Sequence, residues 1–126
     1  MRVFKNKWFV RWAAKEGISD DDLCKAASQV SKGLVDAFLG GGVVKQRIAR
    51  DGEGSSGGFR SILLYRKNER IFFVYGFPKK DRENITRDEL KAFKELAKPT
   101  LTMSDEDTDK ALKAGILTEV MCDEQA

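Results

Sequence analysis

Two strongly apolar strands joined by a tight turn constrain the fold of this chain more than any other feature. The segments FRSILLYR (59–66) and RIFFVYGF (70–77) are rich in β-branched and aromatic residues, and the turn-forming run KNE separates them. Their apolar centres indicate central strands that are covered on both faces. The sequence therefore predicts an antiparallel hairpin in the middle of a sheet.

Shorter patterns predict three more strands, at residues 2–4, 43–49 and 117–121. In the segment 43–49 (VVKQRIA) the side chains alternate between two faces. One face carries Val44, Gln46 and Ile48, and the other carries Lys45 and Arg47. This strand is expected to lie beside the hairpin with its two cations on one side.

Capping residues and apolar periodicity predict four helices. They run from Asn6 to about Glu16, from Ser19 with helical spacing as far as Leu34, from Thr86 to Pro99, and from Ser104 to Gly115. The first two form a helical hairpin whose apolar faces require a sheet to cover them. Trp8 and Trp12 are four residues apart on the first helix and are expected to lie in the core.

These elements predict an α+β fold, in which an N-terminal helical hairpin packs on a small, mostly antiparallel sheet and C-terminal helices follow. A length of 126 residues is typical of one domain. Residues 1–98 are expected to form its main part. Residues 99–126 are expected to form an acidic helix-plus-strand extension of the same domain.

The two cysteines, Cys24 and Cys122, are far apart and have no CxxC spacing, so reduced thiols are expected, with Cys24 in the core. The chain has no histidine, which argues against a zinc site, and no cofactor is expected. Neither a signal peptide nor a membrane span is recognisable. The expected location is the cytoplasm, with no membrane partner.

Charge is distributed unevenly along the chain. Residues 40–82 contain ten Lys and Arg against four Asp and Glu, a net charge of +6. Residues 99–126 contain two against seven, a net charge of −5. This asymmetry indicates a polyanionic partner, or a tail that competes for the same surface.

Basic residues gather at one end of the predicted hairpin. If the two strands pair about their turn, the residue numbers of cross-strand partners sum to 135 or 136. Arg60 then lies opposite Tyr75 or Gly76, beside the segment PKKDR. The strand with Lys45 and Arg47 is the natural neighbour. Such a cluster repels itself in water and is stabilised by phosphates. The alternative is that these side chains are solvated charges that protect strand edges.

The ordered motifs VVKQRIAR, SGGFR and VYGFPKKDR resemble the RelE/ParE superfamily of bacterial toxin–antitoxin toxins, and within it the RelE/HigB-like subgroup. The resemblance covers roughly residues 1–98. It implies a RelE-like microbial RNase fold and metal-independent cleavage of messenger RNA on the translating ribosome. It also implies a cognate antitoxin, expected to be a small helix-turn-helix protein from the adjacent gene.

By position, the resemblance places four basic residues in the catalytic site, namely Lys45, Arg47, Arg60 and Lys79. The residues expected to bind RNA around them are Arg50, Tyr75, Phe77, Lys80 and Arg82. Some members of the family use a histidine or an aspartate near the last strand, whereas this chain has no histidine.

Metal-free RNA cleavage requires a group that takes the 2′-hydroxyl proton, cations for the pentacoordinate phosphate, and a proton for the leaving 5′-oxygen. Arginine serves only the second role. The ammonium form of a lysine is disfavoured among other cations, so Lys45 or Lys79 is the candidate base. Arg47 and Arg60 are candidate phosphate clamps, and an aromatic residue at the strand end is expected to stack a splayed base.

Two other functions stay open from the sequence. One is a ParE-like toxin that inhibits gyrase, and the other is a nucleic-acid-binding regulator without catalysis. A further hypothesis concerns the acidic segment 104–124, which either packs on the core as an extension or lies close enough to the cations to moderate their affinity for a polyanion.

Overall fold

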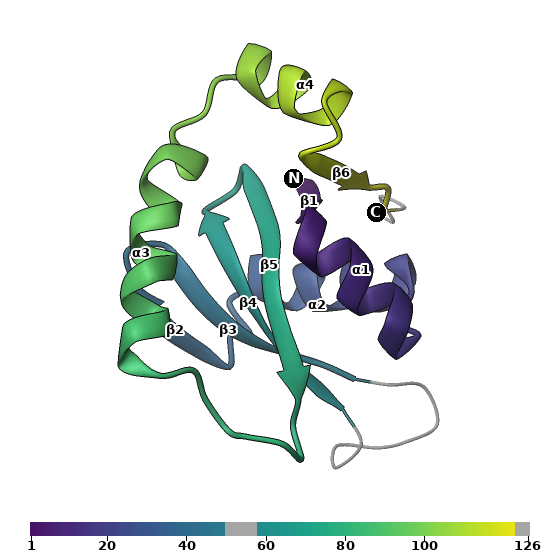
Figure 1. Ribbon diagram of the computed structural model, residues 1–126, viewed down its shortest axis with the longest axis vertical. Helices are drawn as coiled ribbons and strands as arrows, with labels where there is room; N and C mark the ends of the chain where they lie inside the picture. The colour runs from purple at the N-terminus through teal and green to yellow at the C-terminus, as the bar shows by residue number, and fades with distance from the viewer. Residues whose placement is uncertain (50–57, 123–126) are drawn as a thin grey trace.

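The computed structural model describes residues 1–49 and 58–122, and a six-stranded sheet forms the centre of this part of the chain (Figure 1). The strands are β1 (Arg2–Asn6), β2 (Ala37–Gly40), β3 (Val43–Ile48), β4 (Phe59–Arg66), β5 (Arg70–Pro78) and β6 (Leu117–Val120). Their order is β2-β3-β4-β5-β1-β6, and neighbours are antiparallel except β1 and β5, which are parallel. The predicted α+β fold with a mostly antiparallel sheet is confirmed.

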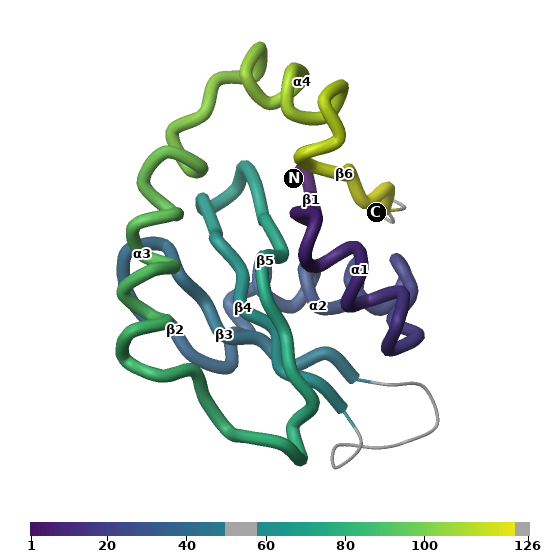
Figure 2. Tube along the Cα trace, viewed as in Figure 1, coloured from purple at the N-terminus to yellow at the C-terminus, as the bar shows by residue number. Residues whose placement is uncertain are grey.

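Helices cover both faces of this sheet. They are α1 (Lys7–Glu16), α2 (Asp20–Ser31), α3 (Arg87–Leu101) and α4 (Asp105–Lys113). The first two bury Phe9 and Leu23 in one apolar cluster, and the last two pack Ala97 and Leu112 on a second cluster. Figure 2 shows the chain passing from α3 through α4 to β6, which returns beside β1. No helix in these ranges is both long and apolar enough to span a membrane.

The helix starts agree with the predicted caps. The Asn6 side chain accepts a hydrogen bond from the Phe9 backbone N–H at 2.8 Å, and Ser19 and Thr86 each form a capping box. The end of α3 differs, because the helix continues past Pro99 to Leu101. Leu101 packs on the second apolar cluster, and this tertiary contact extends the helix beyond the residue that was expected to end it.

The segment after α2 is not helical. The helix ends at Ser31, and Leu34, which was expected on its apolar face, is 64% exposed. The chain then forms β2, a strand absent from the sequence prediction, which pairs with β3 around the glycines 40–42. A short edge strand of four residues carries too little periodicity to be recognised locally.

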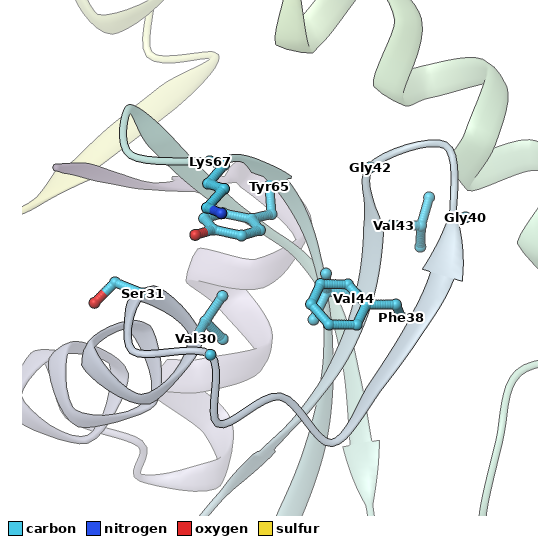
Figure 3. A pocket seen from close by; sticks show the side chains of 10 residues that line it. Val30, Ser31, Phe38, Gly40, Gly42, Val43, Val44, Tyr65 and Lys67 are labelled. Carbon is cyan, nitrogen blue, oxygen red and sulfur yellow. The ribbon is translucent and has the colours of Figure 1, made fainter.

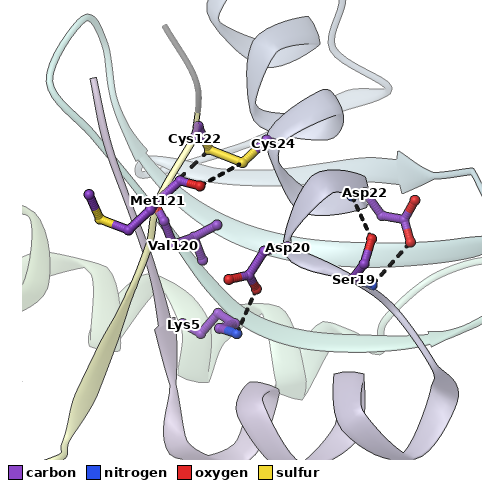
Figure 4. Close-up of a disulfide and its surroundings, with 8 residues drawn as sticks. All are labelled: Lys5, Ser19, Asp20, Asp22, Cys24, Val120, Met121 and Cys122. Atoms are coloured by element: carbon purple, nitrogen blue, oxygen red, sulfur yellow. Dashed lines mark hydrogen bonds and ion pairs between the residues drawn. A yellow bond between two sulfur atoms is a disulfide. The ribbon is translucent and has the colours of Figure 1, made fainter.

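The two cysteines form a disulfide, so the expectation of reduced thiols is wrong (Figure 4). Cys24 lies on α2, and Cys122 follows β6 by two residues. The strand β6 pairs with β1, and α2 packs on the face of the sheet that these strands share. The two Cα atoms of the cysteines are therefore close, at 5.6 Å. The residues are 98 positions apart in sequence, so no local spacing reveals the pairing.

Candidate nucleic-acid site

A β-bulge in β5 decides which residues lie opposite each other in the central hairpin. Near the turn the residue numbers of partners sum to 136, as predicted, but beyond Leu63 they sum to 137 because Val74 is an extra residue. Arg60 therefore lies opposite Phe77, and the partner predicted from the turn is wrong. The bulge also leaves Tyr75 on the same face as Val74, toward α3.

Two cross-strand rows of side chains result on this face. The first row contains Arg47, Arg60 and Phe77, and the second contains Lys45, Ile62 and Tyr75. Neighbouring strands are about 4.8 Å apart, so three cations and a tyrosine share one small area of the sheet. Without the bulge, Tyr75 would lie opposite Ser61, on the other face.

The three cations of these rows differ in what surrounds them. Arg47 is exposed, and the Lys45 ammonium donates to the Glu83 carbonyl oxygen at 3.5 Å. The Arg60 guanidinium is mostly buried and donates through Nη1 to the carboxylate of Asp36, which lies directly before β2. Its Nε atom is buried and has no acceptor within the described ranges. Asp36 thus orients this arginine, a contact that sequence analysis missed because β2 was missed.

The remaining predicted cations lie beyond the end of β5. Lys79 is half-buried, and its backbone N–H donates to the Gly58 carbonyl oxygen at 3.1 Å, which holds it beside the start of β4. Lys80 is exposed in the same turn. Arg50 lies outside the described residues. The structure therefore places Lys79 and Lys80 at the sheet end where the row of Arg60 lies.

Arg82 is engaged by an acid. Its Nη2 atom donates to both carboxylate oxygens of Glu89, at 2.8 and 2.9 Å. This hydrogen bonding raises the pKa of Arg82 above its usual value. It also lowers the pKa of Glu89, with help from the Thr86 backbone N–H. Glu89 belongs to the capping box of α3, so one carboxylate caps a helix and neutralises a predicted RNA-binding cation.

The aromatic residues of the site are unequally accessible. Phe77 is 5% exposed, and the Arg82 guanidinium lies 4.9 Å from its ring centre, so this ring is already covered. Tyr75 is half-buried, with Trp8 at 4.6 Å and Phe93 at 5.6 Å between ring centroids. Its hydroxyl oxygen is 3.5 Å from Nη2 of Arg82.

Trp8 corrects a prediction, because it is 42% exposed and was expected in the core. The buried residues of α1 are Phe9 and Ala13, which form their own stripe at a spacing of four. That stripe was visible in the sequence and could have indicated that the tryptophan stripe beside it is not fully buried.

A hollow of about 320 Å³ lies elsewhere, between the end of α2 and the β2–β3 hairpin (Figure 3). Its lining includes Val30, Phe38, Val44, Tyr65 and Lys67. It contains none of the predicted site residues, and its walls are mainly apolar. The hollow therefore adds nothing to the cationic site.

The acidic segment lies at the opposite end of the sheet. Asp105 at the start of α4 pairs with Arg70, the first residue of β5, and Glu119 on β6 pairs with Arg2. Seven residues of strand, about 23 Å, separate Arg70 from Phe77. The hypothesis that this segment moderates the cationic site is therefore wrong for its described residues, because they lie at the other end of the sheet, where Asp105 and Glu119 pair with other arginines.

Comparison with protein families places the chain in a known family. A family model described as RelE toxin of RelE / RelB toxin-antitoxin system matches residues 1–120. The match continues through α4 to the last residue of β6. No curated protein matches the chain.

Proposed function

We propose, from the premise that this chain belongs to the RelE family of toxins of toxin–antitoxin systems, that it is a metal-independent endoribonuclease cleaving messenger RNA on the translating ribosome. The observation that carries the proposal is the pair of cross-strand rows, which gathers Lys45, Arg47, Arg60 and Tyr75 on one sheet face. Ribosomes place this activity in the cytoplasm. Membership of the RelE/HigB-like subgroup stays a prediction.

The proposed reaction is an attack by the 2′-oxygen of the message on the adjacent phosphorus atom. A lysine, Lys45 or Lys79, takes the 2′-hydroxyl proton. Arg47 and Arg60 bind the non-bridging oxygens as negative charge develops on the pentacoordinate phosphate. The bond between phosphorus and the 5′-oxygen breaks, and this oxygen takes a proton from water, so the products are a 2′,3′-cyclic phosphate and a 5′-hydroxyl. Positioning of the message by the ribosome supplies part of the rate enhancement.

The family also implies a partner, a RelB-type antitoxin. We propose that it is a small helix-turn-helix protein encoded beside this chain, and that it masks the cationic rows or the surface next to them. Its association is then steered by charge, so the association rate falls as salt increases.

Replacement of Arg60 by alanine tests the site. Arg60→Ala removes a phosphate contact from a rigid strand and is expected to reduce message cleavage roughly a hundredfold or more. Arg66→Ala is the matched control, because it removes the same charge from the other end of β4, where Arg66 pairs with Glu69. Mapping of message ends after induction measures both variants, and thermal unfolding verifies that each is folded.

The end mapping also separates the competing functions. Cuts within translated codons that carry 2′,3′-cyclic phosphate ends support the proposal. DNA breaks with intact messages would instead identify a gyrase inhibitor, and intact messages with intact DNA would identify a regulator without catalysis. A folded Arg60→Ala variant that cleaves as fast as the parent would remove Arg60 from the site.

A further inference from the structure

The second half of β5, from Val74 to Pro78, pairs with no strand of the described residues on the side of β1. The parallel pairing joins Arg2–Lys5 to Arg70–Phe73, after which the chain turns into α1. The Asn6 side-chain amide donates to the Val74 carbonyl oxygen at 3.2 Å and closes this ladder. Beyond that point α1, rather than another strand, lies beside β5 (Figure 1).

One face of α1 carries alternating aromatic and basic side chains. Trp8, Arg11, Trp12 and Lys15 follow the spacing of a single helical stripe, and together they line a hollow of about 500 Å³. We call this surface the α1 strip. It is about 10 Å long, from the rise of 1.5 Å per residue along a helix.

The two tryptophans of the α1 strip are held in place. Trp12 packs edge-on against Phe59 at 5.5 Å between ring centroids and lies directly over Gly76. Trp8 stacks on Trp12 with an angle of 18° between the rings. Trp8 is 42% exposed, so it presents an ordered indole to solvent, and little conformational entropy is lost when a ring stacks on it.

The two cations of the strip are exposed, and neither forms a salt bridge with an acid in residues 1–49 or 58–122. This distinguishes Arg11 and Lys15 from Arg60 and Arg82, which are held by Asp36 and Glu89. Unpaired cations on a helix are available to phosphates at no cost of breaking an existing ion pair.

The α1 strip is continuous with the candidate site. Trp8 touches Tyr75, with 4.6 Å between ring centroids, and Tyr75 belongs to the row that contains Lys45. The aromatic path therefore leads from the cationic rows, around the free edge of β5, to the exposed face of α1.

We propose that single-stranded RNA bound at the candidate site continues around the free edge of β5 onto the α1 strip, where a base stacks on Trp8 and phosphates contact Arg11 and Lys15. This inference rests on the proposed function, because it extends the path of the same RNA. Exposed aromatic rings flanked by cations suit unpaired bases and their phosphates. An apolar peptide on the same strip would bury the two cations without partners.

Fluorescence tests the stacking contact directly, because the chain has only two tryptophans. Trp12→Phe leaves Trp8 as the single tryptophan, and Trp8→Phe leaves Trp12. The ligand is a 2′-O-methyl RNA, which cannot be cleaved through its 2′-oxygen, and no ribosomes are present. A short form fills only the candidate site, and a long form also reaches the α1 strip. We expect the long RNA to quench the fluorescence of Trp8 strongly, measured in Trp12→Phe, and the fluorescence of Trp12 weakly, measured in Trp8→Phe.

Affinity tests the cations. On a single strand, each phosphate contact contributes about 0.7 to the slope of log affinity against log salt concentration. Arg11→Ala/Lys15→Ala removes two such contacts, so for the long RNA we expect this slope to become shallower by about 1.4. The control, Lys110→Ala/Lys113→Ala, removes the same charge from α4 and should leave the slope unchanged. Trp8→Leu is expected to weaken the affinity for the long RNA roughly tenfold. For the short RNA all these variants should match the parent.

Equal slopes for the α1 and α4 double variants, together with no quenching of Trp8, would overturn the inference. Loss of antitoxin affinity with normal RNA affinity in the α1 variants would overturn it in favour of a protein surface. If Trp8→Leu does not fold, the exposed Arg11 and Lys15 still decide the question. These measurements contain no ribosome, so they are independent of the Arg60 experiment on message cleavage, and either proposal can fail alone.

Discussion

At the scale of single residues, the availability of a cation depends on its nearest carboxylate. Arg47, Arg60 and Arg82 are all expected to bind RNA, yet Arg60 is oriented by Asp36 and Arg82 is neutralised by Glu89. An arginine whose charge is neutralised by a carboxylate attracts a phosphate less strongly, even though the pair with Glu89 uses only Nη2 of Arg82. Sequence position alone therefore overstates the contribution of Arg82.

Glu89→Gln is expected to tighten RNA binding. Glutamine keeps the capping box of α3, since its side-chain oxygen still accepts from the Thr86 backbone N–H, but it removes the charge that neutralises Arg82. The released cation should add about 0.7 to the salt dependence of log affinity, measured with the uncleavable RNA.

The effect should also follow pH. The pKa of Glu89 lies below its ordinary value of 4.5, so the carboxylate stays charged above that pH, and the difference between parent and variant should be constant there. As pH falls through the lowered pKa, Glu89 takes a proton and the parent should approach the variant. An affinity of Glu89→Gln equal to that of the parent at neutral pH would show that Arg82 does not reach the RNA.

At the scale of elements, β5 determines the site through one extra residue and one missing side chain. The bulge at Val74 turns Tyr75 to the face of the cations. Gly76 then leaves room on the other face for the indole of Trp12, since a Cβ atom at this position would lie 2.3 Å from Cζ3 of the ring. The strand thus serves the cationic rows on one face and supports α1 on the other.

Gly76→Ala is expected to displace Trp12 and to lower the free energy of unfolding by about 1–3 kcal/mol, because an indole ring cannot yield as the end of a flexible side chain does. Denaturant unfolding measures the loss. Because Trp8 stacks on Trp12, the variant should also weaken binding of the long RNA more than the short one. Unchanged stability would mean that α1 shifts away from β5 at little cost.

At the scale of the whole molecule, the two ends of the sheet have separate electrostatic roles. The cationic rows lie at one end, and Arg70 and Arg2 hold α4 and β6 at the other. Asp105 and Glu119 of that C-terminal segment are thereby used in tertiary structure. The disulfide joins α2 to the residue that ends the described chain, so it fixes the same segment from the opposite face.

Cys24→Ser/Cys122→Ser is expected to lower the free energy of unfolding by about 2–5 kcal/mol, because the bond joins residues 98 positions apart and so closes a long loop in the unfolded state. The parent in a reducing buffer should match the variant, whereas the oxidised parent should be more stable. The proposed function would place the protein in the cytoplasm, which keeps most thiols reduced, so under that proposal the variant should still fold and cleave messages there. Equal stability of oxidised and reduced parent would contradict this expectation.

The sequence by itself determined the features that depend on residues a few positions apart. Caps at Asn6, Ser19 and Thr86 set helix starts, and the alternation of β3 places Lys45 and Arg47 on one face. Capping and alternation act within one or two turns or strand steps, so a short window contains all the interacting groups.

Only the tertiary structure decided the bulge at Val74, the pairing of Arg60 with Asp36, the exposure of Trp8 and the disulfide of Cys24. The ion pair and the disulfide depend on which segments the sheet brings together from distant parts of the chain. Asp36 reaches Arg60 only because β2 pairs beside β3, and Cys122 reaches α2 only because β6 pairs beside β1. The free energy of these two contacts belongs to the packed fold, so no local pattern of residues encodes them.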